Sequence, residues 1–383
     1  MPKISPLTFY IPKVPQKQIM HGVEEYSNEE LKKLKKEQPE GFIHIINPDS
    51  KHHNKNTIIR ERWLKAISKK TFLNQNAPSI YYYKMSSKSH TYKGLIGGVS
   101  TKDFEKGTIT QHEKTYPKRA ALMASYLEEV QIQAEPVVVI AETDPLESLT
   151  PKEIEKRRPL FSFTFDQTHH QIWKLIDNEI QQLQKWSEKQ HYFHLADGHH
   201  RVASLSALSK RKNQDFLVSC FLIPQTTIQL HSFIWFLKDV LSGQKENELI
   251  GKIKAYQGEL TSLEAGNSKS YDIVIKIKKN YFGIPGKVGL TPEFIREQLL
   301  DTFPEILDEL CYLPDTGQHS FNDWVSEFDL VFYMKPCSKE LLFGYAKKGK
   351  NLPAKSTYIL PKLITGLFIS PLESKGEFTR SFS

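Results

Sequence analysis

The sequence predicts a mixed α/β fold, and three observations support this class. The chain has 383 residues, of which 39% are hydrophobic and 25% charged, which is enough apolar material for packed cores. Short apolar runs typical of buried strands alternate with segments whose apolar residues recur at helical spacing. Neither a repeat nor a low-complexity tract interrupts this alternation. Because the chain is too long for one small core, we expect two or three domains.

The first hundred residues are predicted to contain both kinds of element. Residues 24–36 and 57–68 have the pattern of helices, whereas the apolar residues 41–48 indicate a strand that ends at a turn. Residues 79–85 and 93–99 are predicted to form paired strands. The aromatic run in the first of these strands is assigned to the sheet core.

The central part alternates strands and helices around a charged insertion. We expect, in order, a helix over 117–130, a strand over 136–141, a helical or loop insertion over 143–161, an amphipathic helix over 173–185, a strand over 192–196, a helix from 199 and a strand over 216–223. The apolar face of the amphipathic helix, expected in the core, carries Trp173, Ile176, Ile180 and Leu183.

The last part is again mixed. An apolar helix is expected to start at His231, and the alternation over 272–277 is typical of an exposed strand. Thr291 and Pro292 are suited to opening a helix. The apolar residues 330–334 predict a strand, and 351–358 a loop.

The stretch with the most chemistry is Asp-Gly-His-His-Arg at 197–201. It lies between a predicted buried strand and a helix marked by Val202, Leu205 and Leu208. Asp197 occupies the expected N-cap position, and Gly198 allows a sharp turn that a ligand can approach closely. A helix start presents unpaired N–H groups and the positive end of the helix dipole, which suit a phosphate.

The side chains after this glycine strengthen the phosphate interpretation. Arg201 offers a planar fork for two phosphate oxygens, and His199 and His200 add donors. The plainer alternative is a surface histidine pair on an ordinary helix, with Asp197 only a cap. A metal site ranks below both, because adjacent histidines at a helix start point in different directions and neither Cys nor an HExxH pattern accompanies them.

Two further segments carry candidate groups. The Glu113 carboxylate, after His112, could take a proton from a hydroxyl, although a solvent-facing glutamate is the simpler interpretation. Lys355, Ser356 and Thr357 have groups that bind phosphate, but no Gly-rich P-loop precedes them.

Composition restricts partners and compartment. The net charge of +8 comes largely from scattered lysines, so a solvated basic surface is favoured over nucleic-acid binding. Three cysteines, far apart and odd in number, favour a reducing compartment. Neither an apolar leader nor a stretch approaching a membrane span is seen, so we expect a cytoplasmic protein without a membrane partner.

Several separated motifs, in order, resemble the family described as domain of unknown function one thousand and fifteen. These motifs are Gly41 to Pro48, Gly94 to Gly97, Ile109 to Thr115 with Arg119, Leu195 to Arg201, Met334 to Pro336, and Leu352 to Tyr358 with Pro361 to Leu363. The resemblance runs along nearly the whole chain.

The central part further resembles the ParB/sulfiredoxin superfamily and, within it, the free serine kinases. These kinases share a His-Glu segment, a helix, a Pro-hydrophobic strand and a strand ending in Asp-Gly-His-His-Arg, in the same order as in this chain. The resemblance implies that Glu113 is the catalytic base and that residues 197–201 handle nucleotide phosphates. It also implies a core over 106–245 with an insertion at about 142–190, flanked by mixed α/β regions over 1–105 and 246–383.

We therefore predict a kinase that transfers phosphate from ATP or ADP, with Mg²⁺, to a hydroxyl of free serine or a similar metabolite. The predicted site has catalytic residues Glu113 and His200, nucleotide-binding residues Asp197, Gly198, His199, His200 and Arg201, and candidate substrate-binding residues His112, Thr115, Arg119, Lys355, Ser356 and Thr357. The alternative is a ParB-like regulator that binds a nucleotide without catalysis. A sulfiredoxin-like reductase fits less well, because His199 stands where that chemistry needs a cysteine, and Cys220 lies in a predicted buried strand.

Overall fold

The structure is a computed structural model that describes residues 1–48, 54–113, 115, 117–237, 243–256, 271–285, 291–315, 328–353 and 355–372. By its internal contacts the chain divides into two compact units. Unit 1 comprises Met1–Gln111, Thr115–Ile228 and Pro361–Ser383, and unit 2 comprises His112–Lys114 and Gln229–Leu360. The central core over 106–245 that the resemblance implies stays a prediction.

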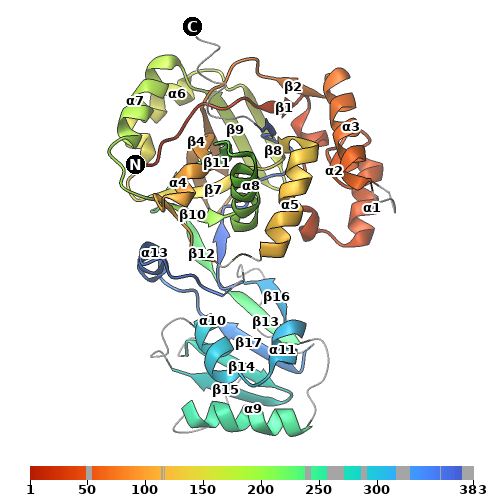
Figure 1. Ribbon diagram of the computed structural model, residues 1–383, viewed down its shortest axis with the longest axis vertical. Coiled ribbons are helices and arrows are strands. Elements are labelled where there is room, and N and C mark those ends of the chain that lie inside the picture. Colours follow the sequence, from red (N-terminus) through yellow and green to blue (C-terminus); the bar gives the residue numbers. More distant parts are fainter. Residues whose placement is uncertain are drawn as a thin grey trace. The chain divides into compact units, whose positions relative to one another are not determined.

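Unit 1 is built on an eight-stranded mixed sheet (Figure 1). Its strands, in spatial order, are β5 (Ile109–Thr110), β10 (Phe193–Asp197), β7 (Val137–Ala141), β11 (Leu217–Pro224), β4 (Thr91–Ser100), β3 (Tyr81–Ser86), β9 (Thr168–Lys174) and β8 (Phe161–Phe165). Strand β10 pairs in parallel with β5 and antiparallel with β7. The sheet thus places the strand that leads to the Asp-Gly-His-His-Arg turn next to the strand that precedes His112.

Helices α5 (Pro117–Val130) and α8 (His199–Lys212) lie side by side against this sheet (Figure 1). On α8, Val202, Leu205 and Leu208 are buried in one cluster with Phe193 and Leu195 of β10. Their helical spacing is what gives α8 a single buried face. The burial of this face fixes the direction in which α8 leaves the turn.

The remaining elements of unit 1 surround the sheet. They are the helices α1 (Asn28–Glu37), α2 (Ile43–Ile46), α3 (Lys55–Ser68), α4 (Thr101–Glu105), α6 (Pro151–Lys156) and α7 (Asp177–Ser187), the short helices η1 (Pro15–Lys17), η2 (Val23–Glu25) and η3 (Pro145–Ser148), and the strand pair β1 (Tyr10–Pro12) and β2 (Phe72–Asn74).

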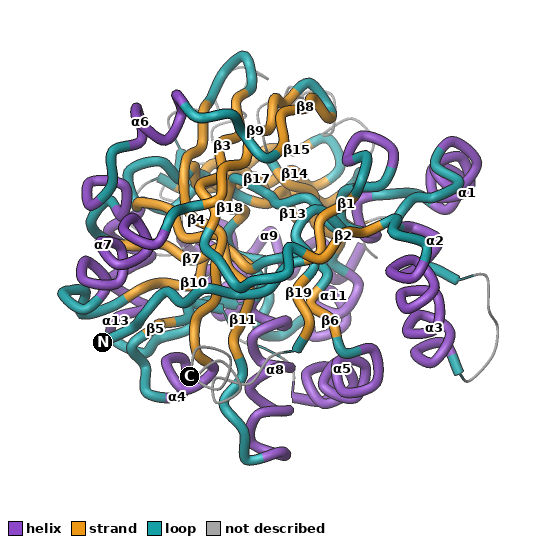
Figure 2. The backbone as a smooth tube through the Cα atoms, turned by 90° about the horizontal axis from the view of Figure 1, so that it is seen from above, coloured by secondary structure: helices purple, strands orange, loops and turns teal. Residues whose placement is uncertain are grey.

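The end of the described chain returns to unit 1. Strand β19 (Ser370–Pro371) pairs antiparallel with β6 (Ile132–Gln133), as Figure 2 shows. Isolated bridges join Ile369 to Tyr10 and Thr365 to Met20. Residues 361–372 are therefore part of the same packed unit as the turn.

Unit 2 contains a five-stranded antiparallel sheet in the order β15 (Asn280–Ile284), β14 (Ile273–Ile277), β17 (Leu330–Met334), β13 (Phe233–Leu237) and β16 (Cys311–Pro314). Its helices are α9 (Gly243–Tyr256), α10 (Thr291–Phe294), η5 (Ile295–Leu299), α11 (Pro304–Glu309) and α13 (Lys339–Lys347), and β12 (Gln229–His231) pairs with β18 (Tyr358–Leu360). Leu249 and Ile253 of α9 share a buried cluster with Trp235 and Phe332 of the sheet. Unit 2 thus has a core of its own.

The predicted mixed α/β class is confirmed, and most predicted elements are present. The expected strand at 41–48 is wrong, because Ile43–Ile46 form the short helix α2. The helix expected after His231 is also wrong, since β13 there is a fully buried aromatic strand. An apolar run of this length has no periodicity that separates helix from strand.

Two further expectations need correction. Trp173 belongs to β9 and not to the following helix, which begins at Asp177, and Ile176 is 55% exposed where a core position was expected. Strand β14 is buried along its whole length and not half exposed. The alternation over 272–277 placed Lys276 on an exposed face. Its Nζ instead donates to the carbonyl oxygen of Phe328 at 2.5 Å.

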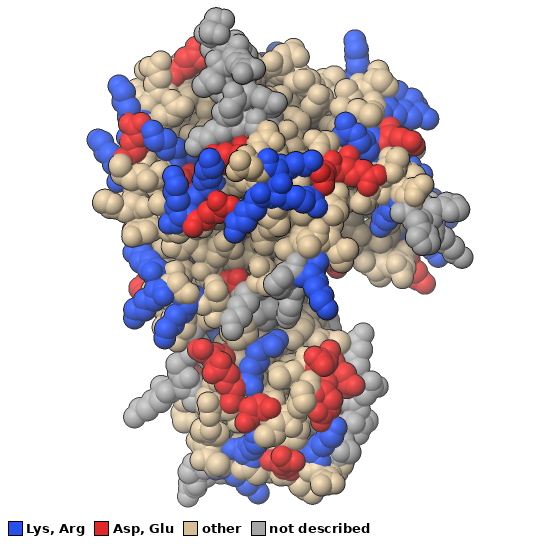
Figure 3. All heavy atoms as spheres, viewed as in Figure 1, with Lys and Arg blue, Asp and Glu red and all other residues tan. Residues whose placement is uncertain are grey.

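The surface carries charge of both signs. On the face drawn in Figure 3, Lys and Arg side chains are interspersed with Asp and Glu. Among the helices that the structure describes, none is both long and apolar enough to cross a membrane.

Candidate functional site

The strand-turn-helix predicted around Gly198 is present. Strand β10 ends at Asp197, Gly198 has a φ of +95°, and α8 begins at His199. A Cβ atom at position 198 would lie 2.5 Å from Cγ1 of the buried Val137. Glycine is therefore required here both by backbone conformation and by the close approach of β7.

The expected N-cap role of Asp197 is wrong. Gly198 itself occupies the N-cap position and, having no side chain, makes no side-chain cap. The Asp197 carboxylate instead forms ion pairs with Arg201 and Lys362. The main-chain N–H groups of a first helical turn point toward the side from which an anion would approach.

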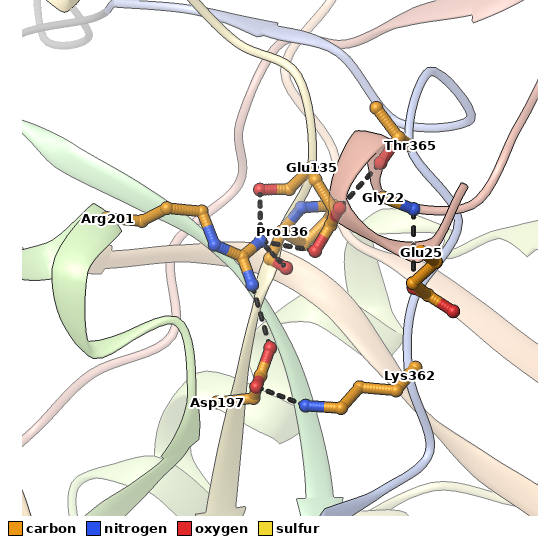
Figure 4. A network of polar contacts seen from close by, with 8 residues as sticks. All are labelled: Gly22, Glu25, Glu135, Pro136, Asp197, Arg201, Lys362 and Thr365. Carbon is orange, nitrogen blue, oxygen red and sulfur yellow. Dashed lines mark hydrogen bonds and ion pairs between the residues drawn. The ribbon is translucent and has the colours of Figure 1, made fainter. Parts of the chain in front are cut away.

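Asp197 is held between Arg201 and Lys362 (Figure 4). Arg201 Nη2 lies 2.8 Å from Oδ2 of Asp197, and Lys362 Nζ lies 2.5 Å from Oδ1. Burial alone would raise the pKa of the Asp197 carboxyl, but Lys362 and Arg201 lower this pKa to about 2. The carboxylate is therefore ionised at neutral pH.

The Arg201 guanidinium also contacts Glu135 and Pro136. Its Nη1 lies 2.6 Å from Oε1 of Glu135 and donates to the carbonyl oxygens of Glu135 and Pro136 at 3.1 and 2.8 Å. Burial would lower the pKa of Arg201, but Glu135 and Asp197 raise it. Arg201 thus ties the first turn of α8 to the chain that enters β7.

Glu135 links this arrangement to the end of the described chain. Thr365 donates through Oγ1 to Oε2 of Glu135 at 2.6 Å. Burial raises the pKa of the Glu135 carboxyl, while Arg201 and Thr365 oppose that rise. Two residues of the 361–372 segment, Lys362 and Thr365, therefore contact the network around the turn.

The two histidines of the turn are the first residues of α8. His199 is buried and His200 is half-buried. The carbonyl oxygen of His200 accepts a hydrogen bond from Oγ of Ser204 at 2.5 Å. Both imidazoles thus belong to the helix start at which an anion would bind.

A buried contact joins β10 to the strand before the His-Glu segment. His194 of β10 is 1% exposed, and its Nδ1 lies 2.5 Å from Oγ1 of Thr110 in β5. Its Nε2 lies 3.2 Å from Oε1 of Glu142, the residue that follows β7. This hydroxyl, imidazole and carboxylate fix the ends of three adjacent strands.

Unit 2 brings the other predicted residues together. The backbone N–H of Leu352 donates to the carbonyl oxygen of His112 at 2.6 Å, and Glu113 forms a parallel bridge with Leu352. Nε2 of the buried His112 lies 3.3 Å from Oγ1 of Thr357. The loop around 352–357 therefore packs directly against the His112–Glu113 segment, which local sequence patterns could not establish.

The Lys355–Thr357 loop has a well-defined conformation. Lys355 has a φ of +62°, its carbonyl oxygen accepts from Nε1 of Trp235 at 3.1 Å, and its ammonium lies 5.4 Å from the Phe233 ring centroid. Ser356 is buried, and its Oγ donates to the carbonyl oxygen of Pro353 at 2.6 Å. Of these side chains, Lys355 is the exposed one.

The predicted residues thus fall into two groups, Asp197 to Arg201 in unit 1 and His112, Glu113 and Lys355 to Thr357 in unit 2. Thr115 is half-buried in unit 1, and the Arg119 side chain lies outside the described part of the chain, as do Lys114 and Ala354. Local sequence reasoning missed Glu135, Lys362 and Thr365. Lys362 lies in the Pro361 to Leu363 motif, which was the one available signal.

The described residues do not form a protein-held metal site. No group of three or more His, Cys, Asp or Glu side chains among them is placed to hold a metal ion. Both oxygens of Asp197, the acidic residue of the turn, are engaged by Arg201 and Lys362.

The chain belongs to the family described as "Protein of unknown function (DUF1015)", whose model matches residues 13–302, which confirms the resemblance to this family. The motifs after residue 302 lie outside this match. A comparison with curated proteins gives no match. Similar solved structures include a free serine kinase variant in complex with ADP, with 12% identity, a TM-score of 0.44, and 75% of this chain and 94% of the other covered. They also include C-terminally truncated SbnI from Staphylococcus aureus, with 14% identity, a TM-score of 0.46 and coverages of 75% and 93%. A third is a conserved hypothetical protein from Pyrococcus furiosus, with 14% identity, a TM-score of 0.40 and coverages of 73% and 94%.

Proposed function

We propose that this member of the DUF1015 family is a nucleotide-dependent small-molecule kinase. It would bind the phosphates of ATP or ADP at the start of α8 and transfer one phosphoryl group to a hydroxyl of free serine or a similar metabolite. The observation that carries the proposal is the β10 to α8 turn, in which Gly198 has a φ of +95° and occupies the N-cap position directly after Asp197. A glycine turn that opens a helix is a geometry that suits phosphate.

The residues of the turn have different parts in this proposal. The main-chain N–H groups of the first turn of α8, with the His199 and His200 side chains, would contact phosphate oxygens. His200, in the partly exposed position, is proposed to stabilise the charge on the transferred group. Arg201, whose guanidinium already contacts Asp197, Glu135 and Pro136, would support the phosphate by holding the turn in place.

The acceptor side of the proposal rests on the family resemblance. Glu113 would accept the proton of the acceptor hydroxyl as its oxygen forms a bond to phosphorus and the bond to the departing nucleotide breaks. His112, Thr115, Arg119, Lys355, Ser356 and Thr357 remain proposed substrate contacts. The packing of the 352–357 loop on His112 supports treating the unit 2 members of this set as one group.

Phosphoryl transfer needs little covalent chemistry from the protein. Positioning and charge stabilisation account for most of the rate acceleration, so a helix start with nearby cations can be sufficient for this reaction. Mg²⁺ bound to the nucleotide would neutralise phosphate charge, and the roles proposed for the protein residues do not depend on its position.

The test is a turnover assay on the full chain. Mg·ATP or Mg·ADP is incubated with serine and other small hydroxyl compounds, and new phosphate esters are detected by ³¹P NMR. The proposal expects an ester with the wild type and a loss of roughly a hundredfold or more in rate with Glu113→Gln, at unchanged nucleotide affinity. The matched control is Glu105→Gln, which replaces an exposed carboxylate at the end of α4.

The outcomes separate the proposed kinase from the regulator. Saturable nucleotide binding without transfer to any acceptor would contradict the kinase and favour a nucleotide-binding regulator. Absence of nucleotide binding would contradict both.

A further inference from the structure

We propose that Lys362 is a phosphate-binding residue whose charge makes the site prefer nucleoside diphosphates and triphosphates to monophosphates. This inference rests on the proposed function of the α8 turn. It assigns a role to a residue outside the stretch 13–302 that the family model matches.

Lys362 lies directly beside the turn. Its Nζ lies 2.5 Å from Oδ1 of Asp197, which directly precedes the Gly198 N-cap of α8. The Lys362 and Asp197 side chains are each 26% exposed. The Lys362 side chain is thus at the turn and partly exposed.

The segment that carries Lys362 is held firmly in unit 1. The backbone N–H of Thr365 donates to the Met20 carbonyl oxygen at 2.9 Å, and that of Gly366 donates to the Ala134 carbonyl oxygen at 3.0 Å. Thr365 also donates through Oγ1 to Glu135 at 2.6 Å. These bonds lie within four residues of Lys362, so the lysine backbone is positioned before any ligand binds, which lowers the entropic cost of using the side chain.

Lysine and arginine are suited to different tasks in this network. The rigid Arg201 fork spans Asp197, Glu135 and Pro136 and holds the turn. A lysine ammonium is a compact charge on a flexible stem, so Lys362 could turn toward phosphate oxygens while staying beside Asp197. Arg201 therefore fixes the site, and Lys362 is the cation better suited to contact the ligand.

Charge gives a second reason for a lysine at this place. An ionised Asp197 beside a phosphate site would repel the phosphate. Lys362 neutralises one oxygen of this carboxylate at the turn, as Figure 4 shows. Removing the lysine would both delete a phosphate contact and leave more of the Asp197 charge facing the ligand, and this penalty grows with the charge of the phosphate chain.

The test compares three nucleotides on the full chain by calorimetry, with AMP, ADP and ATP titrated in excess Mg²⁺. The wild type should bind ADP and ATP more tightly than AMP. Lys362→Met should weaken the binding of ADP and ATP by about tenfold or more and that of AMP by less than about threefold, since a charge-assisted hydrogen bond to phosphate is lost. Lys362→Arg should retain part of the preference.

The control is Lys88→Met, which replaces an exposed lysine in the turn between β3 and β4. It should leave all three affinities unchanged. Equal weakening of AMP, ADP and ATP by Lys362→Met would overturn the inference, because a purely supporting residue affects every nucleotide alike. Unchanged affinities in Lys362→Met would overturn it as well.

A second measurement on the wild type covers the case in which Lys362→Met does not fold. Amine acetylation is followed by mass spectrometry with and without saturating ADP. Protection of Lys362 at least several times greater than that of Lys88 supports the inference, and equal protection contradicts it. A wild type that binds none of the three nucleotides overturns the proposed function and this inference together, whereas nucleotide binding without a Lys362 effect removes this inference alone.

Discussion

Asp197 and Lys362, 165 residues apart in the sequence, form an ion pair at the start of α8. The same carboxylate also pairs with Arg201, one helical turn further on. The turn that we propose as a phosphate site thus contacts a lysine from the end of the described chain. This relationship gives the turn a defined charge state and several measurable consequences.

Asp197→Asn should destabilise the protein in a pH-dependent way. Because the folded-state pKa of Asp197 is lowered from 3.8 to about 2, its ion pairs stabilise the fold above pH 4, and this contribution is lost as the pH falls through about 2. The shift corresponds to roughly 2 kcal/mol. Urea unfolding should show that difference between variant and wild type at pH 5, shrinking toward zero at pH 2. A difference that does not depend on pH would show that the ion pairs do not stabilise the fold.

Gly198→Ala should be strongly destabilising. The new Cβ would combine a φ of +95° with a 2.5 Å approach to Val137 Cγ1, so we expect a loss of about 3 kcal/mol or more in the free energy of unfolding. Gly107→Ala is the matched control, since Gly107 has a φ of +71° but a Cβ added there would meet no atom of the described residues within 4 Å. It should cost about 1 kcal/mol. Equal costs would mean that the contact with β7 is not tight.

Thr357→Val should weaken the packing of the 352–357 loop on His112. The variant removes the hydroxyl that lies 3.3 Å from His112 Nε2, at a cost of about 1 kcal/mol in stability. If this loop positions the acceptor, KM for the acceptor should rise several-fold while nucleotide affinity is unchanged. Thr357→Ser keeps the hydroxyl and should restore KM. An unchanged KM in Thr357→Val would remove the loop from the acceptor site.

Cys220 should be nearly inert toward alkylation. Burial raises the pKa of its thiol to about 12, so the thiolate fraction at pH 8 is very small, and the side chain is 0% exposed. Burial also raises the pKa of Cys337, to about 11. Iodoacetamide labelling followed by mass spectrometry should modify Cys311, which is half-buried, well before Cys220. Rapid modification of Cys220 would reopen the sulfiredoxin-like interpretation.

Local patterns predicted the turn correctly because everything that makes it a turn is contiguous. The buried strand, Gly198 and the apolar face of α8 lie within about twenty residues of one another, and their spacing alone defines strand, turn and helix. The predicted N-cap role of Asp197 was wrong because its partners are not all close to it in the sequence. One of its two partners is the distant Lys362, and no local pattern indicates which distant cation will reach a carboxylate.

The errors in secondary structure have a similar origin. Two short apolar runs have a secondary structure that is decided by the surfaces against which they pack, namely residues 41–46 and 233–237. Trp173 lies at helical spacing from Ile176, yet the strand β9 extends to Lys174 because Trp173 and Lys174 pair with Tyr82 and Tyr81 of β3. Tertiary packing or strand pairing, neither of which a single sequence displays, decided the secondary structure in each of these cases.

The most direct test of the central claim is a structure of the full chain with Mg·ADP. A phosphate at the start of α8, with oxygens about 3 Å from the main-chain N–H groups of His199 or His200, is the result we expect. A nucleotide bound elsewhere, or a turn that stays free of nucleotide at saturating ADP, would contradict the claim that this strand-turn-helix is the phosphate site.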